Sequence, residues 1–380
     1  MKIAIDATFT PNGGSLGHLQ EFIRAMGAIY NKTDFLLYLK RENIEILDDD
    51  ILENCTVKIV PFASYGNIVR VFWGQFFLPF IVIKDSIDVL FCPGNISPII
   101  KTTKIKSQWI ATIGPFCKDV YFGLNTLEKF IMKVNKWLIL LSGYTSNVVV
   151  HESGYSRLLF ETNYKYSSKK QYLIECGKDD FFLPNDLKIV SNNDIVNISS
   201  EDLLCVSHLY PYKNIELLIR VFSVFKKNNN SKLKLFIAGQ QDFFQYFSSL
   251  QDLVKKHKLE SEVIFTGMVS KKELRYAYSK CKLFIFPSLC ESSGYTLIEA
   301  MSCGAPVLAS NKTAIPYTCK EGAEYFDAYS DEDLSLKLET ILHSNELLQN
   351  MKEKSLKRAS EMIDYKKATH EFLTIINNKF

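Results

Sequence analysis

The segment Glu291-Ser-Ser-Gly-Tyr-Thr-Leu-Ile-Glu299 follows the apolar run Leu283-Phe-Ile-Phe286 and the pair Pro287-Ser288. The apolar run has the length and composition of a buried strand, and the residues from Gly294 onward have the spacing of a helix. A strand, a short loop and a helix N-terminus in this order form the repeating unit of a parallel α/β sheet. The segment therefore predicts an α/β fold.

The same segment has the chemistry of a binding site. A helix that begins near Gly294 directs unpaired N–H groups and the positive end of its dipole at the loop, and both favour a bound phosphate. Glu291 in the loop and Glu299 in the helix can accept hydrogen bonds from the hydroxyl groups of a sugar and of a ribose. The alternative is that Glu291 caps the helix and Glu299 is a solvated acid.

Strand and helix patterns alternate on both sides of this segment. In the first half, strands are predicted at residues 3–6, 35–39, 57–61, 88–92, 109–112 and 147–151, and a helix at 17–29. In the second half, strands are predicted at 203–207, 233–238, 262–265, 283–287 and 306–309, and helices at 214–227, 271–280, 295–303 and 334–343. Two such series in a chain of 380 residues predict two Rossmann-like domains that face each other across a cleft.

The domain boundary is predicted from composition. Residues 185–200 are rich in Asn, Asp and Ser and poor in large apolar residues, which is typical of a linker. We expect a first domain over 1–180, a linker over 181–200 and a second domain over 201–362. Residues 345–379 have helical spacing, and the last helix, at 363–380, can cross back to the first domain.

Composition limits the possible functions. The apolar fraction of 47% and the charged fraction of 23% are those of a folded protein, and a net charge of +3 does not require a nucleic-acid partner. Nine cysteines stand singly without C-x-x-C spacing, which favours free thiols in a reducing compartment. The apolar stretch 72–83 contains Pro79 and is shorter than the ~20 residues of a bilayer span. We therefore expect a cytoplasmic protein.

A second motif, Val206-Ser-His208-Leu-Tyr-Pro-Tyr-Lys213-Asn214, joins a predicted strand to a predicted helix. A Lys at such a junction can neutralise the negative charge that develops on a leaving diphosphate. His208 can donate a hydrogen bond to the same phosphate, and Asn214 is a natural N-cap. Taken alone, Lys213 would more commonly be a surface Lys beside a helix start.

Glycines mark further loops at the carboxyl ends of predicted strands. Gly13 and Gly14 follow the first strand of the chain. Gly239 follows the strand at 233–238, and Gly267 with Met268 follows the strand at 262–265, where a nucleobase can bind. Each position alone is equally compatible with a tight turn.

Together these motifs resemble the family 4 retaining glycosyltransferases, which have the two-domain GT-B fold. The resemblance covers most of the chain and is most specific over 203–310. It implies that Glu291 contacts the donor sugar, that Glu299 binds the ribose, and that the backbone of Gly294, Tyr295 and Thr296 holds the diphosphate. It also implies that the Gly13-Gly14 loop contacts donor phosphate or acceptor. The matching residues are Pro287-Ser288, Glu291, Gly294, Glu299-Ala300 and Gly304-Ala-Pro306-Val307.

The chain departs from that family at two places. His208 stands where the family usually has an Arg, which leaves less fixed charge for the diphosphate at neutral pH. The family also often has a His after a middle strand of the first domain, whereas the matching segment Trp109-Ile-Ala-Thr-Ile-Gly-Pro-Phe116 has none. Gly177-Lys178-Asp179 resembles the family's turn near the hinge.

We expect a metal-independent hexosyltransferase without a cofactor, which takes a nucleoside-diphosphate sugar as donor and a glycan or lipid-linked acceptor in polysaccharide or lipopolysaccharide synthesis. Lys213 and the helix dipole supply positive charge, and Asp48-Asp-Asp50 is interpreted as a solvated charge run. Two alternatives remain, a non-catalytic partner subunit and a nucleotide-sugar epimerase. An oxidoreductase is disfavoured because no Gly-x-Gly-x-x-Gly follows either first strand.

Basic and apolar residues in the first domain also predict weak association with the inner face of a membrane. Residues 101–106 contain three lysines, and residues 129–141 combine lysines with Trp137. A peripheral helix on anionic lipid has this composition. A helix packed on the sheet with its lysines in solvent is equally compatible.

Overall fold

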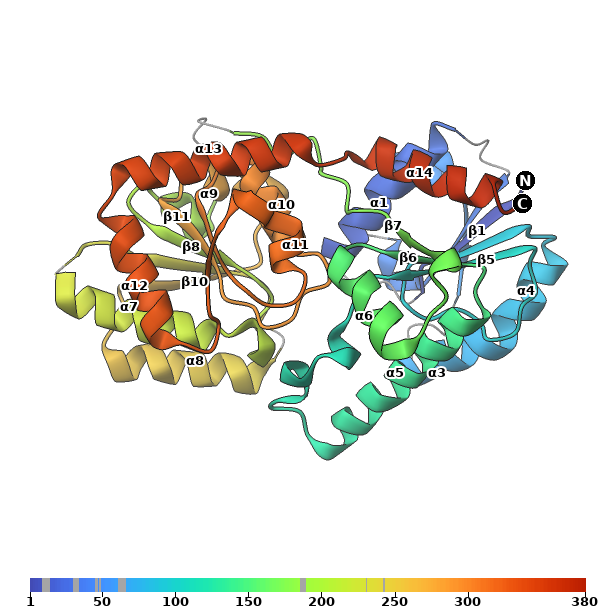
Figure 1. Cartoon of the computed structure of the whole chain (residues 1–380), viewed down its shortest axis with the longest axis horizontal. Helices are drawn as coiled ribbons and strands as arrows, with labels where there is room; N and C mark the ends of the chain where they lie inside the picture. The colour runs from blue at the N-terminus through green and yellow to red at the C-terminus, as the bar shows by residue number, and fades with distance from the viewer. Residues whose placement is uncertain are drawn as a thin grey trace. The chain divides into compact units, whose positions relative to one another are not determined.

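The computed structural model describes residues 1–8, 14–29, 34–44, 47, 49–60, 66–184, 189–229, 231–241 and 243–380. The chain forms two compact units (Figure 1). The first contains residues 1–116, 125–177 and 363–380, and the second contains 117–124 and 178–362. The chain thus contributes residues 117–124 to the second unit, enters it again after Gly177 and returns to the first after Met362.

The first unit is built on a seven-stranded sheet in the order β3-β2-β1-β4-β5-β6-β7, and its strand pairs are all parallel. The five strands between its two edge strands are buried on both faces, as parallel sheets covered by helices require. The strands are β1 (Ile3–Asp6), β2 (Phe35–Leu39), β3 (Thr56–Ile59), β4 (Val89–Cys92), β5 (Ile105–Ile110), β6 (Val148–His151) and β7 (Gln171–Leu173).

Helices connect these strands in the first unit. They are α1 (Gly14–Gly27), α2 (Asp49–Asn54), α3 (Asn67–Phe72), the π-helical turn η4 (Trp73–Phe77), α4 (Leu78–Lys84), α5 (Thr126–Thr145) and α6 (Gly154–Tyr164). Short 3-10 turns complete the unit at η2 (Arg41–Asn43), η5 (Gly114–Phe116) and η7 (Ser168–Lys170).

The last helix of the chain, α14 (Tyr365–Asn377), belongs to the first unit. Its Phe372 ring lies 4.8 Å from the Phe91 ring on β4 and 5.6 Å from the Phe22 ring on α1. Phe372, Leu373 and Ile376 are part of the core that also contains strands β1 and β2. The C-terminal segment is therefore an integral part of the first unit.

The second unit is built on a six-stranded parallel sheet in the order β10-β9-β8-β11-β12-β13. Its strands are β8 (Leu203–Val206), β9 (Leu235–Ala238), β10 (Val263–Gly267), β11 (Leu283–Phe286), β12 (Val307–Ser310) and β13 (Glu324–Phe326). Its helices are α7 (Ile215–Asn229), α8 (Phe244–His257), α9 (Lys271–Lys280), α10 (Tyr295–Ser302), α11 (Ile315–Cys319), α12 (Asp331–Leu342) and α13 (Asn345–Glu361), and its 3-10 turns are η6 (Lys118–Tyr121), η8 (Asp194–Asn197), η9 (Pro211–Lys213) and η10 (Lys320–Gly322).

Residues 189–200, which we expected to form a linker, lie in the second unit. The Asn193 side chain donates to the backbone oxygens of Thr266 and Met268 at 3.1 and 3.2 Å, and Ile195 and Ile198 are buried. These two apolar side chains anchor a segment whose remaining composition is polar. Residues 185–188 lie outside the described part of the chain.

The apolar stretch 72–83 forms the end of α3, η4 and most of α4, with Pro79 in the first turn of α4, where its missing N–H is not needed. Among the helices of the described residues, none combines the length and the hydropathy required to span a membrane.

Candidate active site

The predicted donor residues of the second unit gather at one edge of its sheet. Strands β8 and β11 lie side by side, and the sheet then grows toward β9 and β10 on one side and toward β12 and β13 on the other. Such a reversal of strand order leaves a crevice beyond the carboxyl ends of the two central strands, where α/β sheets bind ligands. Lys213 follows β8 and Glu291 follows β11, so both lie at this crevice.

Lys213 and Glu291 form an ion pair. The Lys213 Nζ donates to the Glu291 Oε1 at 2.5 Å, and the two side chains are 14% and 13% exposed. The ammonium group also lies 5.1 Å from the centre of the Tyr212 ring. Burial alone would lower the pKa of Lys213, but the charge of Glu291 outweighs it with help from Tyr212 and raises that pKa above its ordinary value. Lys213 is therefore a fixed positive charge at neutral pH.

Backbone contacts hold the two loops that carry this pair. The Leu289 N–H donates to the Tyr212 carbonyl at 2.8 Å, which joins the loop after β11 to the turn after β8. The Glu291 N–H donates to the Thr313 hydroxyl at 2.9 Å, which ties the same loop to the segment after β12. Asn214 directly precedes α7, and its Nδ2 donates to the carbonyls of Pro287 and Ala328. Its side chain links β8 and β11 at the site.

Helix α10 begins as predicted, and the residue at its N-cap is Gly294. Gly294 has φ 79°, a left-handed conformation that side-chain-bearing residues rarely adopt. Since Gly294 occupies the cap, the alternative role of Glu291 as the helix cap is wrong. Tyr295 and Thr296 form the first turn of α10, and its N–H groups lie at the end of the helix that favours anions.

Glu299 is held inside the second unit and is not a solvated surface acid. The Tyr278 hydroxyl on α9 donates to its Oε2 at 3.2 Å. Burial raises the pKa of Glu299 to about 7, although the bond from Tyr278 opposes that shift. The carboxyl group therefore titrates near neutral pH, where it changes from a hydrogen-bond donor to an acceptor.

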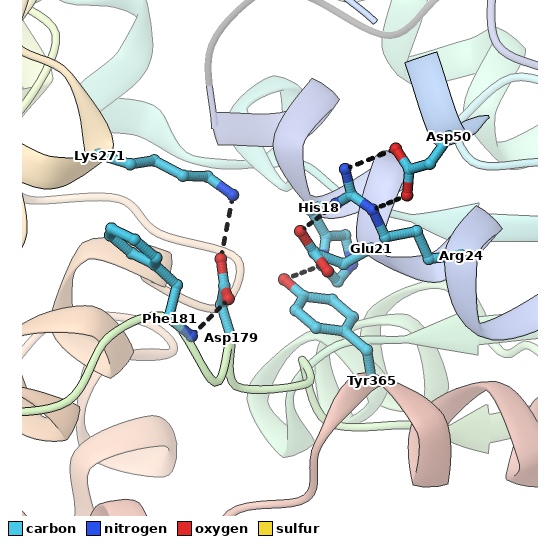
Figure 2. A network of polar contacts seen from close by, with 8 residues as sticks. All are labelled: His18, Glu21, Arg24, Asp50, Asp179, Phe181, Lys271 and Tyr365. Atoms are coloured by element: carbon cyan, nitrogen blue, oxygen red, sulfur yellow. Dashed lines mark hydrogen bonds and ion pairs between the residues drawn. The ribbon is translucent and has the colours of Figure 1, made fainter. Parts of the chain in front are cut away.

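An ion pair that the sequence did not indicate lies in the same unit. The Lys271 Nζ is 3.0 Å from the Asp179 Oδ2, and the Asp179 Oδ1 accepts from the Phe181 N–H at 2.9 Å (Figure 2). Asp179 and Lys271 also act electrostatically on Glu299, in opposite directions. These residues are far apart in the sequence, so no local pattern could have predicted their contact.

Close backbone packing explains the glycine at 239. A Cβ there would lie 1.9 Å from the Ser207 carbonyl oxygen, and φ is 146°. The Gly239 N–H donates to the Gly267 carbonyl at 2.9 Å, so the ends of β8, β9 and β10 meet at this point. Met268 follows directly and is exposed.

Two further predicted residues are placed as follows. His208 is half-buried, and its carbonyl accepts from the Tyr210 N–H at 3.0 Å in the turn after β8. Gly14 is the first residue of α1 in the first unit, and Gly13 lies outside the described residues. The structure thus brings together Lys213, Glu291 and the start of α10.

Asp48 lies outside the described residues, whereas the neighbouring Asp50 is paired in the first unit. The Arg24 Nε is 2.5 Å from the Asp50 Oδ2, and the Arg24 Nη1 is 2.5 Å from Glu21 (Figure 2). Arg24 lowers the pKa of Asp50 through a hydrogen bond. Asp50 therefore helps to fasten α2 to α1.

Residues 194–358 match the family model described as glycosyl transferases group 1. This match lies within the second unit and covers less than half of the chain. A serotype-specific mannosyltransferase, WbdA of Escherichia coli, is 30% identical over 175 residues, which are 46% of this chain and 21% of WbdA. The chain thus spans about a fifth of the length of the curated relatives it matches first.

Solved structures match both units. HepE of Anabaena, in complex with UDP and glucose, is 15% identical with a TM-score of 0.71, and each chain is covered completely. WaaG, a glycosyltransferase involved in lipopolysaccharide biosynthesis, is 15% identical with a TM-score of 0.76 and coverage of 98% and 99%. At this identity the likeness shows the fold, and the predicted fold class of two Rossmann-like α/β domains is confirmed.

Proposed function

We propose that this chain is a retaining glycosyltransferase that moves a sugar from a nucleoside diphosphate to a glycan or lipid-linked acceptor, in the synthesis of a surface polysaccharide or lipopolysaccharide. The observation that carries this proposal is the buried Lys213–Glu291 pair beside the N-terminus of α10, at the strand-order reversal of a group 1 domain. A cation, a carboxylate and a helix N-terminus there suit a diphosphate that bears a hydroxylated sugar.

In the proposed reaction the bond between the anomeric carbon and the β-phosphate oxygen breaks on the same face on which the acceptor oxygen bonds to that carbon. The acceptor proton passes to the leaving phosphate. Lys213 and the first turn of α10 stabilise the negative charge that grows on that phosphate, and His208 adds a hydrogen bond. Glu291 holds Lys213 in place and accepts hydrogen bonds from the sugar hydroxyls.

Glu299 completes donor binding in this proposal. Its carboxylate accepts hydrogen bonds from the two ribose hydroxyls, while Tyr278 fixes its orientation. Gly239 follows β9, and Gly267 with the exposed Met268 lies at the end of β10, on the side of β8 where the base would lie. A nucleotide sugar would therefore extend along the carboxyl edge of the sheet.

The first experiment is a thermal-shift screen of nucleoside-diphosphate sugars, since a bound donor raises the melting temperature by mass action. The donor that binds is then used to measure hydrolysis and transfer by the full chain. Glu291→Gln and Lys213→Met should each lower turnover by a factor on the order of 10²–10³. Lys282→Met and Glu201→Gln are the matched control, because they disrupt a Lys–Glu pair of the same unit at the amino end of β11.

The turnover of the four variants and of the wild-type chain decides between catalysis at this site and the alternatives. Loss of turnover in the first two variants, with wild-type turnover in the control pair, supports the proposal. Wild-type transfer by both Glu291→Gln and Lys213→Met would overturn it. A donor that binds but is never hydrolysed or transferred by the wild-type chain would favour the non-catalytic subunit.

We also propose that the first unit binds the surface of an anionic membrane through an apolar face of α5. Six large apolar side chains on this helix are between 40% and 66% exposed, and they follow one another at intervals of three or four residues, so they form one stripe. They are Leu127, Phe130, Val134, Trp137, Leu141 and Tyr144. Lys129 and Lys133 are exposed on the same helix.

A second exposed apolar group lies on the segment from α3 to α4. The α3–α4 segment and α5 are hydrogen-bonded to the same loop. The Gln75 side chain bonds to Ser97 and Ile99, and the Ser142 side chain of α5 bonds to Ser97. Ile100 in this loop is itself exposed. The exposed residues of the α3–α4 segment are Phe72, Phe76, Phe77, Phe80 and Ile83.

One part of the predicted membrane surface is wrong. Lys106 is buried, and its Nζ donates to the Pro98 carbonyl and to the Thr145 hydroxyl, so it offers no charge to a lipid. Lys104 forms an ion pair with Asp88 at 2.9 Å. The charge available to an anionic surface therefore comes from the lysines of α5 and from the exposed Lys101.

Sedimentation with vesicles tests this surface. The chain should bind vesicles that contain phosphatidylglycerol more strongly than vesicles of phosphatidylcholine, because the lysines add electrostatic attraction. Trp137→Glu and Phe80→Glu should each weaken binding, whereas Leu336→Glu, which alters an exposed apolar residue on α12, should not. Equal binding by all three variants, or no binding by the wild-type chain, would overturn the proposal.

A further inference from the structure

A buried cluster of His18, Glu152 and Cys176 lies in the first unit, apart from the donor residues described above. His18 comes from α1, Glu152 follows β6 and Cys176 follows β7, so the cluster lies at the carboxyl edge of the sheet. One ligand atom from each residue, a ring nitrogen, a carboxylate oxygen and a sulfur, lies within 4.8 Å of the others. Glu152 and Cys176 are each 3% exposed.

Neighbouring groups orient the His and the Glu. The Tyr365 hydroxyl at the start of α14 lies 2.8 Å from the His18 Nδ1 (Figure 2). That contact occupies Nδ1 and turns Nε2 toward Glu152. The Trp109 Nε1 donates to the Glu152 Oε1 at 2.9 Å. Proteins orient metal ligands in this way, by a hydrogen bond to the other ring nitrogen of a His and by another to a carboxylate.

The distance between His18 and Glu152 fits two ligands of one metal ion better than a direct hydrogen bond between them. The His18 Nε2 is 3.8 Å from the Glu152 Oε1, which is longer than a hydrogen bond. Zinc binds nitrogen and oxygen at about 2.0–2.2 Å and sulfur at about 2.3 Å, so two tetrahedral ligands lie about 3.3–3.6 Å apart. The ligand atoms of the three side chains would need to approach one another by at most about 1.5 Å around such an ion.

We propose that His18, Glu152 and Cys176 bind one divalent transition-metal ion, zinc by the softness of the ligand set, with water in the fourth position. On binding, the Cys176 S–H bond breaks, the thiolate sulfur bonds to the ion and the proton passes to solvent. The ion would also offset the cost of burying the Glu152 charge.

Such an ion ties three segments of the first unit together. His18 fixes α1, Glu152 fixes the turn before α6, and Cys176 fixes the residues just before the chain leaves the unit at Gly177. The ion would also act on α14, because His18 contacts the Tyr365 hydroxyl at the start of that helix. Tyr365 packs closely against Gly177, since a Cβ on that glycine would lie 2.7 Å from the Tyr365 nitrogen. Metal binding should therefore stabilise the part of the first unit that contains Gly177 and the start of α14.

The test uses the full, untagged chain after treatment with a chelator and dialysis into metal-free buffer. Zinc chloride is titrated in competition with a chromophoric chelator, and the melting temperature is measured with and without zinc. We expect one equivalent of zinc per chain and a higher melting temperature with metal. Cobalt(II) in place of zinc should give the charge-transfer absorption of a thiolate ligand, which reports Cys176 directly.

Two variants and two controls locate the site. Cys176→Ser and His18→Gln should each weaken zinc binding by at least tenfold, and Cys176→Ser should remove the thiolate band. Cys55→Ser is the matched control, because that buried thiol already donates to the Ile51 carbonyl and a hydroxyl can replace it. His370→Gln, at an exposed position on α14, controls for the loss of a His.

The wild-type chain alone can overturn the proposal, so misfolded variants do not obscure the result. Absence of stoichiometric zinc binding, or a cobalt spectrum without a thiolate band, would mean that the three side chains are held together by protein contacts alone. Zinc binding that survives both Cys176→Ser and His18→Gln would place the metal elsewhere and would overturn the assignment equally.

Discussion

Removing both Lys213 and Glu291 should affect stability and turnover differently, and a double-mutant cycle measures the two effects separately. Lys213→Met leaves the Glu291 carboxylate 13% exposed without its cation, and Glu291→Gln leaves the ammonium without its anion. Breaking a buried pair by removing one partner costs about 3–5 kcal/mol. Because both side chains keep some exposure, we expect about 3 kcal/mol for each single variant.

The double variant Lys213→Met with Glu291→Gln should be less destabilised than either single variant, because no uncompensated charge remains buried. For a unit of this size, a loss of about 3 kcal/mol lowers the melting temperature by roughly 6–12 °C. Urea unfolding monitored by circular dichroism gives the four free energies of the cycle. Because two single losses of about 3 kcal/mol are followed by a smaller loss in the double variant, the expected coupling between the two sites is favourable and larger than about 3 kcal/mol.

Activity should behave differently from stability in the same four proteins. The turnover of each single variant should fall by a factor on the order of 10²–10³, the usual effect of removing one group that stabilises developing charge. The double variant should regain stability without regaining turnover. Additive losses of stability would show that solvent screens the pair, and turnover restored in the double variant would refute the role of Lys213 in leaving-group stabilisation.

Three other perturbations follow from the structure. In the folded chain Glu299 keeps its proton up to about pH 7, whereas in the unfolded chain it loses the proton near pH 4.5. The free energy of unfolding of the wild-type chain should therefore fall as pH rises between these values. Urea unfolding at pH 5 and pH 8 measures this fall, and Glu299→Gln should remove it. The donor affinity of the wild-type chain, measured by calorimetry, should rise over the same interval as the carboxylate becomes an acceptor for ribose hydroxyls. Gly239→Ala should destabilise the second unit by more than about 3 kcal/mol, because the new Cβ would collide with the Ser207 carbonyl oxygen. Gly267→Ala should cost only about 1 kcal/mol, because φ is 69° but the nearest atom to the new Cβ, the Gln241 Nε2, is 4.0 Å away. Calorimetric melting of both variants checks this contrast. Vesicle binding should weaken as salt rises but persist in part, because salt screens the lysines and leaves the stripe around Trp137 intact; equal binding at low and high salt would contradict this.

The fold of the second unit could be predicted closely from the sequence because its strands are short, continuous apolar runs with helical patterns between them. Strands β8, β9, β11 and β12 and helices α7, α9 and α10 lie within two residues of their predicted bounds. The edge strand β13 was missed, since its three residues are too few to form a pattern.

The first unit was harder to predict because polar side chains are buried in its sheet. The sequence placed a strand at residues 109–112, whereas β5 covers Ile105–Ile110. Lys106 and Gln108 lie within that strand and are buried, and their nitrogen atoms find partners far away in the sequence. Lys106 bonds to Thr145, and the Gln108 Nε2 donates to the carbonyls of Asn95 and Ile139. A local pattern cannot show that a polar residue will find such partners, so Lys106 was interpreted as part of a basic surface.

The same distinction separates the predicted parts of the candidate site from the missed ones. Glu291, Gly294 and Glu299 lie within one strand–loop–helix segment, so their spacing alone indicated a site. Tyr278, which orients Glu299, lies 21 residues away on another helix, and Thr313, which anchors the Glu291 backbone, lies 22 residues away. Only the packed structure brings them together.

The two units differ in their likeness to known glycosyl transferases, and this difference predicts which unit recognises the acceptor. The match to group 1 glycosyl transferases, residues 194–358, falls within the second unit, where the predicted donor residues lie on loops that follow strands. The first unit lies outside that match and carries the exposed stripe of α5 and the cluster around Glu152, both assembled from side chains whose roles follow from packing. If donor chemistry depends on the second unit, changes that alter acceptor choice should fall in the first. Substitutions such as Trp137→Glu should then lower transfer to a lipid-linked acceptor in vesicles while leaving donor hydrolysis in solution unchanged.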